Sequence, residues 1–146
     1  MGWGFKASAL FYCHKSNTNI DMETKKKTVE ELHEALACFV GTFAYHTHKT
    51  GELKLLLTDG CDYIRREAES FWLFDSIVTY QLDMTVRGLY HQVWKLTKQS
   101  DETWLLTCKD GNNNICVVQR IQFSDFPLAD ITIWIIDGIA LLPSEY

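Results

Sequence analysis

An aspartate inside an apolar run is the residue of this sequence that is best placed to do chemistry. Asp75 interrupts the run FWLFDSIV, which covers residues 71–78. Burying an ionised carboxylate is costly unless it is paired or hydrogen-bonded. Two interpretations are open. Asp75 caps a short helix or pairs with an arginine or a tryptophan N–H, or it is the polar group at the floor of a pocket, where carboxylates with perturbed pKa values gather. No neighbouring residue stands at the spacing of a catalytic motif.

A second candidate is the pair His46 and His48, which are separated by one residue. In a strand such residues share a face, so both imidazoles could bind one metal ion, with Cys61 or His33 as a further ligand. No second ligand pair stands at a characteristic spacing, however, and a histidine in a connecting segment is usually solvated. We therefore expect no metal and no other cofactor.

The cysteines offer a third possibility. Five are present, and none forms a CxxC pair, which disfavours both a secreted disulfide framework and a zinc knuckle. Cys108 and Cys116 lie on opposite arms of a connection; if residues 110–114 form its loop, residue 109 faces 115 and Cys108 faces Cys116. A disulfide between them is conceivable, but reduced and mostly buried thiols in a cytoplasmic protein are the expectation.

Helices are predicted in the first part of the chain. The capping-box pattern TVEE at residues 28–31 predicts a helix over 29–39. The sequence TDG at 58–60 predicts a second helix start, capped by Thr58 or Asp59. This second stretch is amphipathic at first and apolar on every side from Phe71, which is typical of a buried core helix. The segment between the two is predicted to be a connector, with a short strand at 53–57 as an option.

Strands are predicted beyond residue 81. Alternating or β-branched patterns mark residues 92–98, 103–109, 115–123, 131–136 and 139–142, and Asp137-Gly138 between the last two is a strong hairpin signal. We expect an α+β fold, with N-terminal helices packed on one face of a C-terminal antiparallel β-meander of about five strands. The face that packs on the helices carries four apolar side chains: Trp94, Leu96, Trp104 and Leu106. Residues 22–146 form this single domain, and residues 1–21 are predicted to be a non-core N-terminal extension.

Composition narrows the class of function. A chain of 146 residues that is 47% hydrophobic and 23% charged is long and apolar enough to form a globular core. Its net charge of −5, without a basic stripe, makes nucleic-acid binding an unfavoured function. No apolar run reaches the length of a membrane span. Phosphate-binding and hydrolase motifs such as GxxxxGK[ST], GxSxG and HExxH are absent, so the sequence favours binding over catalysis.

Four pieces of sequence carry a resemblance to a known family. They are LLLTDGCDYIRREAESFWLFDSIVTYQ, QVWKLTK with TWLLTCKDGN, FSDFPL, and the terminal GIALLPSEY. Over residues 28–146 the chain resembles a family of small bacterial proteins, a domain of unknown function numbered 6876, which occurs in genomes, plasmids and phages. The resemblance implies one small cytoplasmic domain, and it carries no established activity.

Two functions remain in consideration. The first is a protein-interaction module associated with bacterial mobile elements or host adaptation, which should expose an aromatic patch and bind a protein partner. The alternative is a ligand-binding or enzymatic domain with an aromatic pocket around Asp75. The candidate binding residues are Asp59, Trp72, Asp75, Tyr80, Trp94 and Trp104.

Overall fold

The computed structural model describes residues 26–146, and the predicted extension at residues 1–21 lies outside them. The first half of the described chain contains α2 (Val29–Ala37), β1 (His46–Thr50), β2 (Leu53–Leu57), α3 (Asp59–Glu67), α4 (Phe71–Tyr80) and α5 (Met84–Arg87). The second half contains β3 (His91–Lys98), β4 (Trp104–Asp110), β5 (Ile115–Ile121), β6 (Asp130–Ile136), β7 (Ile139–Leu141) and the 3-10 turn η1 (Pro143–Glu145).

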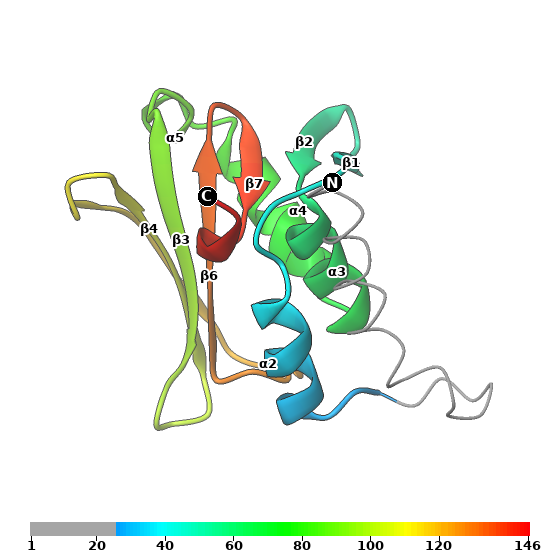
Figure 1. Ribbon diagram of the computed structural model, residues 1–146. Coiled ribbons are helices and arrows are strands. Elements are labelled where there is room, and N and C mark those ends of the chain that lie inside the picture. Colours follow the sequence, from blue (N-terminus) through cyan, green and yellow to red (C-terminus); the bar gives the residue numbers. More distant parts are fainter. Residues whose placement is uncertain (1–25) are drawn as a thin grey trace.

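The strands form one seven-stranded mixed sheet in the order β1-β2-β7-β6-β3-β4-β5 (Figure 1). All neighbours are antiparallel except β2 and β7, which run parallel. The α+β class and the five predicted strands are confirmed, but the antiparallel meander of about five strands is wrong. The hairpin of β1 and β2 extends the sheet at one side, and β6 returns to lie beside β3 rather than beside β5.

Local sequence explains where the helices begin. Thr28 caps α2 in a capping box with Glu31, as predicted. Thr58 caps α3 and accepts a hydrogen bond from the backbone N–H of Cys61. The apolar stretch that follows is a separate helix, α4, because the chain turns at Glu69, whose φ is +49°.

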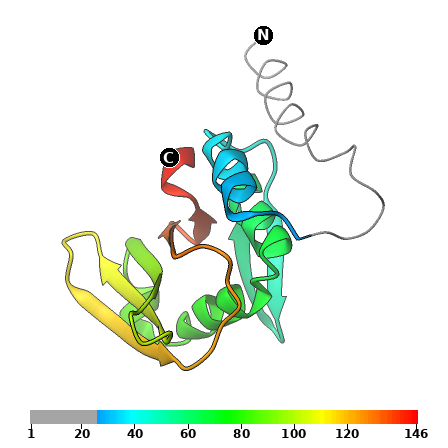
Figure 2. The same cartoon turned by 90° about the horizontal axis from the view of Figure 1, so that it is seen from below.

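The inner face of the sheet carries the core. Side chains alternate along β3, β4 and β6, and the predicted inward set, Trp94, Leu96, Trp104 and Leu106, is buried. These side chains form one apolar cluster with those of α3 and α4. Figure 2 shows α4 between the β3–β5 part of the sheet and the β1–β2 hairpin, with the C-terminal turn on the other side of β6 and β7.

The predicted pairing around the two cysteines is only partly correct. Lys109 pairs with Ile115, as expected, but a β-bulge then shifts the register and Cys108 pairs with Val117. Cys108 and Cys116 are both free thiols. Burial raises the pKa of Cys108 to about 12, so its thiol stays protonated at neutral pH. Cys38 is disulfide-bonded, and the prediction of reduced thiols does not hold there.

Candidate functional site

The pair His46 and His48 lies in β1, a strand that the sequence did not predict. β1 pairs with β2 along its whole length, with His48 opposite Leu55. Because Leu55 belongs to the inner face, His46, His48 and Thr50 all point toward the helices. Three polar side chains are thereby aimed from one strand at α3 and α4.

Asp75, on α4, is bound by two of these residues. Nε2 of His48 lies 2.9 Å from Oδ1 of Asp75, and the hydroxyl of Thr50 donates to the same oxygen at 2.5 Å. The hydrogen bond from Thr50, followed by that from His48, lowers the pKa of Asp75 below its ordinary value. The side chain of Asp75 is nevertheless 47% exposed, whereas His48 is buried. Asp75 is therefore neither a helix cap nor a fully buried charge.

The hydrogen bonds of His48 determine its tautomer. Nη1 of Arg65 lies 3.1 Å from Nδ1 of His48, and a guanidinium group can only donate. Nδ1 must therefore accept, and in the neutral ring the proton is on Nε2, which donates to Asp75. The imidazole is an uncharged link between Arg65, whose side chain is mostly buried, and a partly exposed carboxylate.

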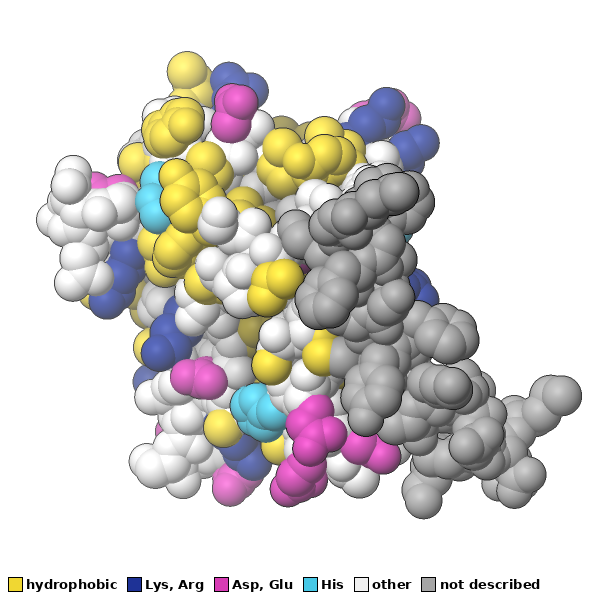
Figure 3. All heavy atoms as spheres, in the orientation of Figure 1, with side chains coloured by type: hydrophobic (Ala, Val, Ile, Leu, Met, Phe, Trp, Pro, Cys, Tyr) yellow, Lys and Arg dark blue, Asp and Glu magenta, His cyan; other side chains and the backbone are white. Residues whose placement is uncertain are grey.

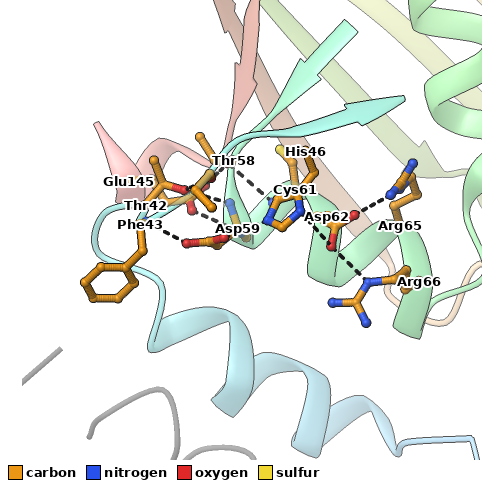
Figure 4. A network of polar contacts seen from close by, with 12 residues as sticks. Thr42, Phe43, His46, Thr58, Asp59, Cys61, Asp62, Arg65, Arg66 and Glu145 are labelled. Carbon is orange, nitrogen blue, oxygen red and sulfur yellow. Dashed lines mark hydrogen bonds and ion pairs between the residues drawn. The ribbon is translucent and has the colours of Figure 1, made fainter. Parts of the chain in front are cut away.

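His46 has carboxylates on both sides. Its Nε2 lies 2.7 Å from Oδ1 of Asp59, and its Nδ1 lies 3.7 Å from Oδ2 of Asp62 (Figure 4). The backbone N–H of Phe43 donates to Oδ2 of Asp59 at 2.7 Å. Burial alone would raise the pKa of Asp59, but the hydrogen bonds from His46 and Phe43 outweigh burial, and the pKa is lowered.

Asp62 connects the two histidines. One of its oxygens accepts from Arg65, and the other accepts from Nε of Arg66 at 2.9 Å. Because Arg65 also donates to His48, a continuous chain of polar contacts runs from Asp59 to Asp75 across β1, α3 and α4. We call this set of contacts the β1–α4 network; its members are Asp59, His46, Asp62, Arg65, His48, Asp75 and Thr50.

The ring nitrogens of both histidines are engaged within the network. Both nitrogens of each histidine face protein groups, so neither imidazole is available as a general base in this arrangement. Within residues 26–146, no group of three or more histidine, cysteine or acidic side chains is arranged to hold a metal ion. The side chains of Asp75 and His46 are 47% and 36% exposed. Asp75 also has one carboxylate oxygen, Oδ2, that accepts no hydrogen bond from the described residues.

The TDG turn is joined to the end of the chain. The hydroxyl of Thr58 and the backbone N–H groups of Gly60 and Leu142 all donate to the carboxylate of Glu145, at 2.5, 2.9 and 2.9 Å. A Cβ atom on Gly60 would lie 2.8 Å from the Glu145 carboxyl carbon. A glycine at this position therefore allows the close approach of Glu145, which holds η1 against α3.

The structure places the six predicted binding residues in two groups, four at the core and two in the β1–α4 network. Trp94 and Trp104 are buried in the core, where Trp104 contacts Phe126. Tyr80 packs against Trp94 with ring centroids 5.5 Å apart, and Trp72 is partly buried beside the same core. Asp59 and Asp75 belong to the β1–α4 network instead. A binding role for the six residues stays a prediction.

A cavity of about 430 Å³ lies at the end of α4, away from Asp75. Its lining includes Arg87 and Tyr90, the Asp137-Gly138 turn, and the amide side chains of Gln81 and Gln92. The two amides hydrogen-bond each other at 2.9 Å, and Gln92 also accepts from Nε1 of Trp94. The polar floor of the cavity is thus already hydrogen-bonded within the protein.

The outer face of the sheet has an apolar corner where β3, β6 and β7 meet. His91 packs edge-on against Trp134 at 4.9 Å between ring centroids, and Tyr146 packs against the same tryptophan at 5.7 Å. The register brings Val93 opposite Trp134 and Ile136 opposite Ile139. Figure 3 shows hydrophobic side chains gathered around a histidine over these strands. We call this surface the outer apolar corner: His91, Val93, Trp134, Ile136, Ile139 and Tyr146.

Comparison with known proteins identifies the family. The profile of a family of unknown function, DUF6876, matches residues 30–146. The chain belongs to this family. The family resemblance read from the TDG turn, the aromatic-aspartate run and the terminal PSEY is thereby confirmed. No match was found among curated proteins or among solved structures. Among the described residues, no helix of this family member has the length and apolar character needed to cross a membrane.

Sequence reasoning gave Arg65 and Asp62 no role in a site, and it did not connect Glu145, in the terminal PSEY, with the TDG turn. The two histidines were singled out as possible metal ligands, because residues two apart share a face in a strand. The metal site was then discounted because this segment was interpreted as a connector, and a role in hydrogen-bonding the aspartates of α3 and α4 was not considered. Glu145 could not have been connected with Thr58, because 87 residues separate them in the chain.

Proposed function

We propose that this chain is a protein-interaction module and that the outer apolar corner is its contact surface. The observation that carries the proposal is a row of three contacting rings on the outer face, in which Tyr146 is exposed and His91 and Trp134 are half-buried. A solvent-facing sheet surface normally carries polar side chains. Exposed apolar patches that include tryptophan and tyrosine are typical of protein–protein contacts.

The rest of the outer face supports this choice by contrast. Beyond the corner, Lys95 pairs with Asp130 at 3.6 Å, and Arg120 lies 3.4 Å from Asp101. Those charges pair with each other at the surface, as on an ordinary solvated sheet face. Apolar side chains are also exposed on β5, where Ile115 and Val118 are 61% and 60% exposed, but the corner is where aromatic rings pack against one another. The family resemblance favours a cytoplasmic setting and an association with bacterial mobile elements or host adaptation.

The test compares two alanine substitutions of aromatic residues that are about equally exposed, one inside the corner and one outside it. Tyr146, in the corner, is 84% exposed, and Phe123, beyond β5, is 82% exposed. We expect a stoichiometric partner to co-purify with the tagged wild-type chain and with Phe123→Ala, and to be lost with Tyr146→Ala. Quantitative mass spectrometry measures the three samples. Absence of a partner, or equal loss with both variants, contradicts the proposal.

A further inference from the structure

We infer that α4 presents a second contact surface, centred on Asp75, which receives a lysine or arginine side chain from a basic segment of a partner protein. The inference concerns the helical side of the molecule, whereas the outer apolar corner lies on the other face of the sheet. It therefore holds or fails independently of the proposed function.

The first step is that Asp75 is oriented but not saturated. Both hydrogen bonds that it accepts from described residues end on Oδ1, one from Thr50 and one from His48. No residue in the described part of the chain donates to Oδ2, and the side chain is half exposed. A carboxylate held by one oxygen in this way presents the other at a defined position, which lowers the entropic cost of binding a partner group.

The second step is that the charge of Asp75 is not neutralised. Thr50 and the Nε2–H tautomer of His48 are uncharged donors. Across residues 26–146, no lysine or arginine lies within ion-pair distance of Asp75; Arg65 donates to Nδ1 of His48, the ring nitrogen that faces away from Asp75. The lowered pKa keeps Asp75 ionised at neutral pH. An added cation would therefore gain a charge-assisted hydrogen bond without displacing an existing partner.

The third step concerns the surroundings of Asp75. Phe71 precedes it by four residues, so both lie on one stripe of α4, and Phe71 is 46% exposed. The guanidinium of Arg65 lies 5.2 Å from the centroid of the Phe71 ring, within the range of a cation–π contact. Lysine and arginine pack their alkyl stems on apolar surfaces while the charged head reaches a polar group. A basic side chain fits this pair, and the net charge of −5 favours its approach.

The substitution Asp75→Asn separates binding from structure. An asparagine at this position keeps an acceptor oxygen for Thr50 and His48 but removes the charge. If Asp75 only ties α4 to β1, the variant and the wild type bind a basic peptide equally. If Asp75 is a binding group, the variant retains its thermal stability and loses binding. Asp125, whose side chain is 62% exposed, provides the matched control Asp125→Asn.

The experiment is an NMR titration of the full chain with three probes. They are a leucine-flanked arginine peptide, the same peptide with citrulline in place of arginine, and methylguanidinium chloride. We expect saturable shifts in α4 and His48 with the arginine peptide, and an affinity about tenfold lower with citrulline or in Asp75→Asn, as for loss of one charge-assisted hydrogen bond. The control Asp125→Asn should bind like the wild type.

Three results would overturn the inference. They are no saturable shift with the arginine peptide, an unchanged affinity in Asp75→Asn, and an affinity for methylguanidinium equal to that for the peptide. The last result would show that the site takes a free cation and that a partner segment adds nothing. Binding of the arginine peptide that weakens in Asp75→Asn and in the citrulline probe supports it.

Discussion

Helix α4 is fastened to the sheet by two contacts of different chemistry. On β1, one partner is charged: the carboxylate of Asp75 accepts hydrogen bonds from the uncharged side chains of His48 and Thr50. On β3, it is uncharged: Gln81, just after the helix, pairs with Gln92, and Tyr80 packs on Trp94. The first contact depends on ionisation and is partly open to solvent. The second is buried and independent of charge, so the two should respond differently to mutation and to pH.

The largest effect is expected at the uncharged contact. Replacing Trp94, which is 1% exposed, by alanine removes a core side chain and leaves a cavity. We expect Trp94→Ala to lower the free energy of unfolding by about 3–5 kcal/mol, equally at pH 5 and pH 7. Urea unfolding at both pH values measures this. A loss that differs between the two pH values would contradict the assignment of this contact as charge-independent.

A smaller effect is expected where the chain end meets α3. Alanine at position 60 would ordinarily favour the helix by about 1 kcal/mol. Its Cβ, however, would lie 2.7 Å from Cδ1 of Leu142 and 2.8 Å from the Glu145 carboxyl carbon. We therefore expect Gly60→Ala to destabilise the protein by about 1–2 kcal/mol.

The double variant Gly60→Ala/Glu145→Ala provides the control for this prediction. If the displaced carboxylate is the cause, the double variant should lose less stability than the sum of the two single variants, as measured by a double-mutant cycle of urea unfolding. A stabilising Gly60→Ala, or strictly additive losses, would show that the glycine is not required for the approach of Glu145.

The two carboxylates that bind side chains of β1, Asp59 and Asp75, should lose their stabilising effect in acid. The pKa of Asp59 and that of Asp75 are lower in the folded state than in the unfolded chain. Their contribution to stability is therefore fully present above the unfolded pKa, about 3.9, and is lost as the pH falls through the folded values. We expect the urea concentration at which half of the protein is unfolded to decrease when the pH is lowered below about 4. The decrease should be smaller in the double variant Asp59→Asn/Asp75→Asn. An identical pH profile would contradict the role of these carboxylates.

The smallest effect is expected from a single hydroxyl. Thr50→Val keeps the branched shape that suits β1 and removes the donor to Asp75. We expect a loss of about 1 kcal/mol or less in the free energy of unfolding, together with a rise in the pKa of Asp75. NMR titration of the Asp75 carboxyl carbon measures the second quantity. An unchanged pKa would mean that His48 alone sets it.

Local pattern was sufficient for much of this fold. The capping box at Thr28 and the helix start at Thr58 were predicted where they occur. The Asp137-Gly138 turn joins β6 and β7 with positive φ at both residues, as a two-residue hairpin turn requires. These predictions succeeded because each depends on side chains and backbone within a few residues of one another.

Predictions that depend on distant partners were less successful. β1 reads HTHKT and lacks an apolar alternation, so nothing local predicts a strand. It becomes one because β2 pairs with it and because α3 and α4 supply acids for its histidines. Asp75 was singled out from the sequence, but its two partners on β1 and its half-exposed position were not foreseen. The bulge beside Cys108 likewise shifted a register that turn length alone predicted differently.

The sequence by itself determined the α+β class, the helix starts at Thr28 and Thr58, the five strands beyond residue 81 and the family. Tertiary structure alone decided that β2 and β7 run side by side in parallel, that Glu145 binds the TDG turn, and that two histidines hold two aspartates. The physical reason is the separation along the chain over which each kind of interaction acts. Propensity, capping and turn geometry act between near neighbours, whereas pairing of strands and of buried polar groups is settled by which surfaces meet when the whole chain packs.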